Sequence, residues 1–145
     1  MTIDPRVHVS LRLLGDFDPD VATTRLCLNP SHTHLRGALA GNGRTGRRYQ
    51  HSLWLMGSEE HVHSLNFEPH VTWLLDQIEP HAEALAGLKA EGVECDVDCF
   101  WESTWMSGGP WISPESMARL STLNLPLVIS FYLADEGDGE DRFSS

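Results

Sequence analysis

The sequence has few basic residues and no long apolar run. Its 145 residues include 10 lysines and arginines against 21 aspartates and glutamates, which gives a formal net charge of -11. General nucleic-acid binding needs a basic surface that neutralises phosphates, so this composition argues against it. The chain also has no apolar stretch of transmembrane length and lacks the basic-then-apolar start of a signal peptide. We therefore expect a cytoplasmic protein with no membrane contact.

Cysteine is also scarce, with only Cys27, Cys95 and Cys99. In an extended strand the last two share one face and lie about 13 Å apart, too far for a disulfide. Their spacing does not fit a zinc site either. The sequence therefore predicts buried, reduced thiols, as in a reducing compartment, and it predicts no bound metal or cofactor.

The length of the chain predicts one domain with a substantial core, because a chain of this size buries roughly 70% of its unfolded surface. We place this domain at residues 1–134. Five of the 11 residues in 135–145 are aspartate or glutamate, and the segment has no apolar periodicity. They are expected to form a disordered acidic tail.

Periodicity predicts four strands along the chain. Alternating apolar and polar residues indicate strands at 7–13, 93–101 and 127–133, and a mostly apolar run indicates another at 49–56. Between them, residues 32–48 are rich in glycine and arginine and are expected to form a loop or irregular hairpin.

Capping residues predict three helices. Asp18 followed by Pro19 starts a short helix that ends before Asn29, and Ser113 starts one with Met117, Leu120 and Leu123 on its apolar stripe. A longer helix is predicted over 67–90. Pro80 removes a backbone hydrogen bond in its middle, and because the apolar stripe keeps its phase there, we expect a kink rather than a break.

The predicted helices alternate along the chain with strands that have apolar residues on one face only, and this pattern favours an α+β fold. The specific expectation is a two-layer sandwich, an elaboration of the ferredoxin-like fold. Its sheet is expected to be mainly antiparallel, with the helices on one face.

Several segments in order resemble the bacterial family of unknown function called DUF4279. The resemblance covers roughly residues 7–133 and is carried by an ordered series of segments: Val9 to Asp20, Leu28 to Ser31, Ser52 to Trp54, Trp73 to Pro80, and Trp101 to Pro114 with the following helix to Leu120. The family has no established activity, so the resemblance implies no catalytic or binding residues.

The glycine-rich loop contains two apparent motifs. Residues 41–46 match the dinucleotide fingerprint, but the motif requires a strand before it and a helix after it, so we interpret it as a flexible turn. Arginines cluster in the same loop. A guanidinium can bind a carboxylate or phosphate, while the alternative is a solvated loop that offsets nearby acids. These arginines are Arg36, Arg44, Arg47 and Arg48.

Other polar clusters have simpler interpretations. The pairs His32/His34 and His61/His63 have no ligand partner at a recognised spacing and are interpreted as surface histidines. A row formed by Glu94, Asp96 and Asp98, joined by Glu102, is expected on the solvent side of its strand. With no nucleophile elbow and no visible base, the sequence shows no catalytic constellation and favours a protein that is not an enzyme.

The turn at 101–114 contains Trp105 and Trp111, a residue type favoured at binding hot spots. Our leading hypothesis is a non-enzymatic interaction module that binds a basic protein, as an immunity or defence-associated protein would. The acidic strand face would supply the charge and the two tryptophans would anchor the partner. The alternative is a small-ligand site or enzyme in which the arginine loop (Arg36, Arg47 and Arg48) and this turn form two walls of a pocket. A structural subunit is a third possibility, and the oligomeric state is left open.

Overall fold

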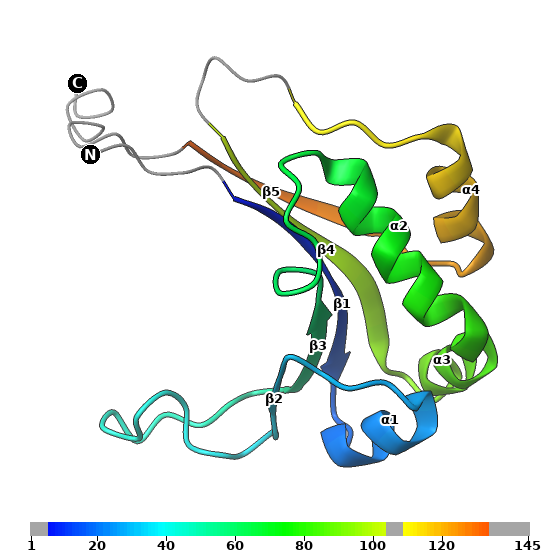
Figure 1. The fold of residues 1–145 in the computed structure, drawn as a ribbon. Coiled ribbons are helices and arrows are strands. Elements are labelled where there is room, and N and C mark those ends of the chain that lie inside the picture. The colour runs from blue at the N-terminus through cyan, green and yellow to red at the C-terminus, as the bar shows by residue number, and fades with distance from the viewer. Residues whose placement is uncertain (1–5, 104–108, 134–145) are drawn as a thin grey trace.

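The computed structural model describes residues 6–103 and 109–133, which form a five-stranded sheet with helices packed beside it (Figure 1). Trp105 and the predicted acidic tail lie outside these residues. The strands are β1 (Val7–Gly15), β2 (His32–His34), β3 (Ser52–Gly57), β4 (Glu94–Ser103) and β5 (Leu127–Leu133). The helices are α1 (Pro19–Leu26), α2 (Phe67–Ile78), the 3-10 helix η1 (Glu79–His81), α3 (Ala82–Ala90) and α4 (Pro114–Thr122).

The strand order across the sheet is β2-β3-β1-β4-β5. The pairs β2–β3, β3–β1 and β1–β4 are antiparallel, and β4–β5 is parallel. Because parallel neighbours need a crossover connection, α4 lies between β4 and β5 along the chain. The predicted combination of helices with a mainly antiparallel sheet is confirmed.

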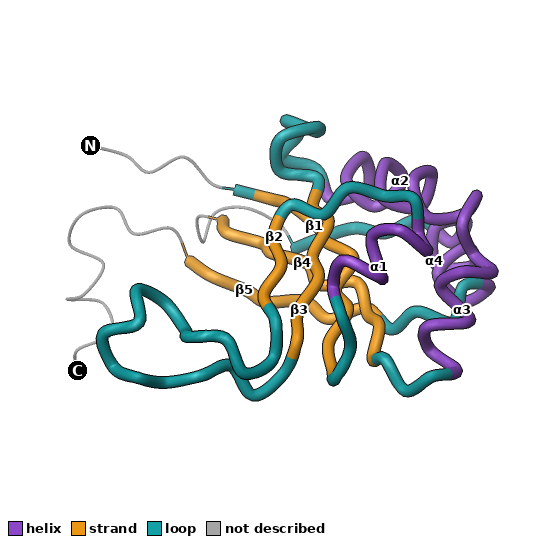
Figure 2. The backbone as a smooth tube through the Cα atoms, turned by 90° about the horizontal axis from the view of Figure 1, so that it is seen from below, coloured by secondary structure: helices purple, strands orange, loops and turns teal. Residues whose placement is uncertain are grey.

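One face of the sheet carries the apolar side chains, and Figure 2 shows the helices on that side. Alternation turns Val9, Leu11 and Leu13 of β1 inward, and all three are fully buried. Their neighbours Trp54 of β3 and Val97 of β4 are also fully buried. The strand patterns that the sequence predicts for β1 and β4 are therefore confirmed.

Capping residues begin two helices as predicted. The carboxylate of Asp18 accepts the N–H of Asp20 at 2.9 Å, and the hydroxyl of Ser113 accepts the N–H of Ser116 at 3.0 Å. The predicted apolar stripe of α4 is wrong at Met117, which is exposed, whereas Leu120 is buried. The apolar side of α4 that packs in the core is therefore narrower than the predicted stripe, because it includes Leu120 but not Met117.

The expected kink at Pro80 is wrong, because the helix divides there. α2 ends at Ile78, η1 contains Pro80, and α3 begins at Ala82. Proline lacks the N–H that would continue the helical ladder, and its ring clashes with the preceding turn. The tighter 3-10 turn absorbs this defect, and Ile78 and Leu85 on either side remain buried.

The glycine-rich segment is an irregular hairpin, as expected, with one short strand that the sequence did not predict. β2 pairs with β3, and an isolated bridge joins Leu39 to Arg48. Gly41, Gly43 and Gly46 all have positive φ, so the fingerprint-like sequence forms turns. Within the described part of the chain, no helix has the length and apolar character to cross a membrane.

Candidate functional site

Figure 2 shows the helices on one side of the sheet, and the strand register gives the opposite side charged or aromatic residues from β1, β2, β4 and β5. Strand register places alternate residues on this side, which we call the helix-free face. Its members are His32 and His34 of β2; Leu53, Leu55 and Gly57 of β3; His8, Ser10, Arg12 and Leu14 of β1; Glu94, Asp96, Asp98, Phe100 and Glu102 of β4; and Val128, Ser130 and Tyr132 of β5.

The acidic row predicted on β4 lies on this face, with an arginine beside it. Arg12 donates from Nε and Nη2 to the two carboxylate oxygens of Asp96, at 3.0 and 2.8 Å. Asp98 lies 3.9 Å from the same guanidinium. The hydrogen bond to Asp96 raises the pKa of Arg12 above its ordinary value. The negative charge of Asp96 is thus largely neutralised by Arg12, while Glu94 at the end of the row is exposed.

A row of aromatic rings crosses the same face next to the acidic row, at Phe100, the residue of β4 that follows Asp98 on this face. The ring of His8 stacks on Phe100 with centroids 4.8 Å apart, and Phe100 stacks on Tyr132 at 4.9 Å. The guanidinium carbon of Arg6 lies 5.3 Å from the Phe100 ring centroid, and Arg6 is also 3.6 Å from the carboxylate of Glu102. Burial lowers the pKa of His8, which favours its neutral form. The face thus has a row of three stacked rings beside its carboxylates.

A hollow of about 500 Å³ opens at the margin of this face, where β2, β3 and β1 meet the loop after β3. At its base, a Cβ on Gly57 would lie 2.9 Å from the hydroxyl of Ser10, so glycine keeps the space open. The lining mixes polar and apolar groups and includes two carboxylates: His8, Ser10, Asn29, Pro30, Ser31, His32, Leu55, Gly57, Glu59, Glu60 and His61. Such a lining suits a cationic or hydroxylated group.

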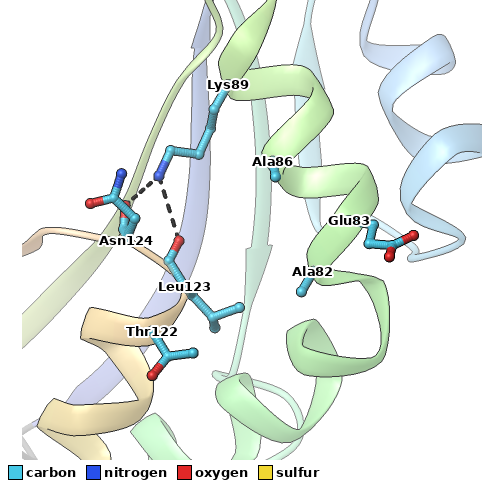
Figure 3. Close-up of a pocket in the computed structure, with 7 residues that line it drawn as sticks. All are labelled: Ala82, Glu83, Ala86, Lys89, Thr122, Leu123 and Asn124. Atoms are coloured by element: carbon cyan, nitrogen blue, oxygen red, sulfur yellow. Dashed lines mark hydrogen bonds between the residues drawn. The ribbon is translucent and has the colours of Figure 1, made fainter.

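A second hollow, of about 380 Å³, lies between α3 and the end of α4 (Figure 3). The ammonium group of Lys89 donates to the backbone carbonyls of Leu123 and Asn124, as the dashed lines in Figure 3 show. This cation therefore holds the C-terminal end of α4, where a positive charge is favourable. Because Ala82 and Ala86 form much of the remaining lining, the hollow has little chemistry to offer a ligand.

A buried serine–histidine pair lies just beyond β3. Nε2 of His70 is 2.7 Å from the carbonyl oxygen of Ser64, which only accepts, so this nitrogen carries the proton. Nδ1 then accepts from the hydroxyl of Ser58 at 2.6 Å, and that hydroxyl accepts the N–H of Val9 at 3.0 Å. Ser58 and His70 are both fully buried. A substrate has no access to this pair, and its geometry serves to join β1, the loop after β3 and α2.

The sequence analysis did not identify this pair, because its two members lie in what looks like a polar linker and at a helix start. A histidine on the inner side of an otherwise apolar helix stripe was the available signal: His70 is one residue before Val71 and four before Leu74. The sequence alone does not identify Ser58 as its partner.

The arginine loop makes contacts within itself and with β1's end. Arg36 forms an ion pair with Asp16 at 2.7 Å, and Arg48 donates to the carbonyl of Gly37 at 2.7 Å. Arg47 is exposed. These contacts stabilise the hairpin. Of the three candidate arginines, Arg47 has no side-chain partner among the described residues.

The tryptophan of the predicted aromatic turn that the structure describes, Trp111, lies away from the arginine loop. Trp111 is 65% exposed and precedes α4, where the N–H of Ser113 donates to the carboxylate of Glu68 on α2 at 3.1 Å. Residues 109–113 therefore lead directly into the helix α4, whereas the arginine loop extends from the β2–β3 margin of the sheet (Figure 1). The structure does not bring Trp111 together with the arginines, nor does it put Trp111 on the helix-free face.

The histidines and cysteines are placed as follows. His32 and His34 share a face with ring centroids 5.8 Å apart, and His34 stacks on Tyr49 at 3.6 Å. In residues 6–103 and 109–133, no three His, Cys, Asp or Glu side chains are grouped so as to hold a metal ion. Cys95 and Cys99 are buried, and burial raises the pKa of Cys95 to about 11, so these thiols are poor nucleophiles.

Comparison with known proteins identifies a family and no activity. Neither the curated proteins nor the solved structures contain a match to this chain. The family model described as "Domain of unknown function (DUF4279)" matches residues 5–134, which is most of the chain and includes every described strand and helix. The chain therefore belongs to the DUF4279 family.

Proposed function

We propose that the chain is a non-enzymatic interaction module whose helix-free face binds a basic protein. The observation that carries the proposal is a sheet face, free of helices in the described chain, that combines a row of carboxylates with a stacked aromatic row. Charge and flat apolar area on one surface are the features that give protein interfaces their specificity and their anchors.

Electrostatics favour a basic partner over an acidic one. The chain carries a formal net charge of -11, which attracts cationic surfaces over several ångströms and speeds encounter. On the face itself Arg12 neutralises Asp96, whereas Glu94 and Asp98 form no comparably short ion pair with another described residue. A lysine or arginine from a partner would meet these two carboxylates.

The aromatic row supplies the contact area. Stacking fixes Phe100 between His8 and Tyr132, so these rings lose little freedom when a partner packs on them. Arg6 already lies over Phe100, which shows that the ring accepts a guanidinium on its face.

The biological setting that fits this chemistry is a cytoplasmic protein that neutralises its partner, as an immunity or defence-associated protein does. Reduced, buried thiols support a reducing compartment. For the scaffold we propose a ferredoxin-like core extended by one strand. In support, β1-α1-β2-β3-α2-β4 follows the β-α-β-β-α-β order of that fold, and α4 with β5 adds a parallel strand beside β4.

Charge reversal on the face tests the proposal. Glu94→Lys combined with Asp98→Lys reverses the acidic row while leaving the Arg12–Asp96 pair in place. The matched control, Glu83→Lys with Glu115→Lys, makes the same charge change at exposed positions on helices. Each immobilised protein is incubated at low salt with extract from cells that naturally make it, and retained proteins are identified by mass spectrometry.

We expect the unmodified protein and the control to retain the same basic protein, and the face variant to lose it. Raising the salt concentration should also weaken retention, because exposed charges are screened within about 8 Å at physiological ionic strength. Retention of no protein at low salt, or equal retention by the face variant, would rule out this interface.

A further inference from the structure

The strand β5 forms one margin of the sheet, and its own sequence has none of the residues that usually protect an edge strand. Its seven residues, Leu127 to Leu133, include no charged residue and no proline. Among the described residues, its only strand partner is β4. Natural proteins protect long edge strands with lysine, proline or a bulge, because unpaired backbone groups recruit another strand. The opposite margin, β2, is only three residues long and needs less protection.

Exposed apolar side chains gather on both faces of this edge. Phe131 is 62% exposed on the helix side, and Tyr132 and Val128 are 53% and 38% exposed on the helix-free side. A third of the large apolar residues exposed in the described chain thus lie on this one strand. Apolar exposure of this kind typically marks an interaction surface.

The ladder to β4 determines which backbone groups are free. The N–H of Val97 donates to the carbonyl of Pro126 at 2.9 Å, and Val97 is paired with Leu127. In a strand, successive residues direct their backbone groups to opposite sides. Val128, Ser130 and Tyr132 therefore bond toward β4, while Ile129 and Phe131 direct their N–H and C=O groups outward.

We propose that β5 pairs antiparallel with β5 of a second copy of this chain, about a two-fold axis at Ser130. In this register Ile129 faces Phe131 of the second copy through the outward backbone groups, and Val128 faces Tyr132 of the second copy. A two-fold axis makes each contact occur twice, which is how self-complementary interfaces form. The result is one continuous ten-stranded sheet.

A second copy fits this edge better than a basic segment does, because β5 has no carboxylate to attract one. The acidic rows of the two copies would be separated by three strand spacings, or about 14 Å. That distance exceeds the screening length of about 8 Å at physiological salt, so repulsion between two acidic chains weakens as salt is added. Added salt should therefore strengthen self-association, the reverse of its effect on a basic partner.

Pairing at this edge leaves the helix-free face uncovered and does not rest on the proposed function. Sedimentation equilibrium of the full chain over a range of concentrations, at low and high salt, measures it directly. We expect the average mass to rise from one chain toward two with increasing concentration, and the dissociation constant to fall when salt is raised. A mass of one chain under every condition would overturn the proposal.

Two substitutions locate the contact. Phe131→Lys should abolish the dimer even though it lowers the net negative charge, since lysine on an edge blocks strand pairing. Leu65→Lys is the matched control, a 56% exposed residue in the loop before α2, and it should leave the dimer unchanged. If the first variant fails to fold, Tyr132→Lys on the other side of β5 replaces it.

Thermal melts of each variant establish that the monomeric form is folded. A dimer that survives both β5 substitutions, or one that Leu65→Lys dissociates as well, would show that the copies meet elsewhere. If β5 instead pairs with a different protein while the pure chain stays monomeric, the two-fold pairing is wrong.

Discussion

The buried hydroxyl of Ser58 provides a demanding test of the described packing, because it serves two partners at once. It accepts the N–H of Val9 at 3.0 Å and donates to Nδ1 of His70 at 2.6 Å. Ser58→Ala removes both bonds and leaves a buried N–H and a buried imidazole nitrogen without partners. Each unsatisfied buried group costs about 1–3 kcal/mol, so the variant should lose about 2–6 kcal/mol of unfolding free energy.

Such a loss is a large fraction of the total, since domains are stable by roughly 5–15 kcal/mol. For a chain of this length it corresponds to a decrease in Tm of roughly 3–4 °C per kcal/mol. Guanidinium titration followed by tryptophan fluorescence measures the free energy, and calorimetry measures the Tm. Trp54, Trp73 and Trp101, which pack in or against the core, should report the transition.

Ser52→Ala is the matched control. Ser52 is also a fully buried serine of the same sheet region, but among the described residues its hydroxyl has one hydrogen-bond partner, the N–H of Arg36 in the hairpin, at 2.9 Å. Losing that single bond should cost about 1 kcal/mol. Equal destabilisation by the two variants would refute the argument that Ser58 joins β1 to α2 through His70.

Two further predictions concern titration and reactivity. Burial lowers the pKa of His70 below its ordinary value of 6.5, so the unfolded chain binds this proton more readily than the folded one. The unfolding free energy should therefore fall as the pH drops through 6.5 toward the lower folded pKa, and guanidinium titrations between about pH 7 and pH 5 should show a smaller decline in His70→Gln. A thiol reagent at neutral pH should label Cys27 in the native protein and reach Cys95 and Cys99 only after unfolding, because the first is exposed and the others are buried. Native labelling of all three, measured by mass spectrometry, would contradict the described core.

Local patterns predicted much of the secondary structure. Alternation in β1 and β4 reports directly which side chains are buried, since successive residues of a strand face opposite sides. Asp18 and Ser113 mark helix starts because a capping oxygen bonds an N–H only two or three residues away. The acidic side of β4 could be predicted for the same reason.

Errors arose where a neighbour distant in sequence decided the outcome. Met117 fits the apolar stripe of α4 by spacing, but the described chain places no element over it. β2 exists because β3 offers it a free edge, and three residues of sequence carry no signal for this. The division at Pro80 is the exception, because its cause is local: the missing N–H and the ring clash end the helical ladder, although the apolar stripe on both sides is continuous.

The candidate site was only partly visible in the sequence. Glu94, Asp98 and Glu102 were expected to share a solvent-facing row, and they do. Their environment depends on Arg12, because the antiparallel register of β1 with β4 places it opposite Asp96, 84 residues away.

The sequence by itself determined which side of β1 and of β4 is buried and where α1 and α4 begin, because alternation and capping depend on residues a few positions apart. Only the tertiary structure decided the order of the strands, the partners of Arg12 and His70, and the position of β5 at an open margin. These depend on which apolar faces meet and in what register, and that choice is made between segments far apart in the chain. The separation of the arginine loop from Trp111 has the same origin.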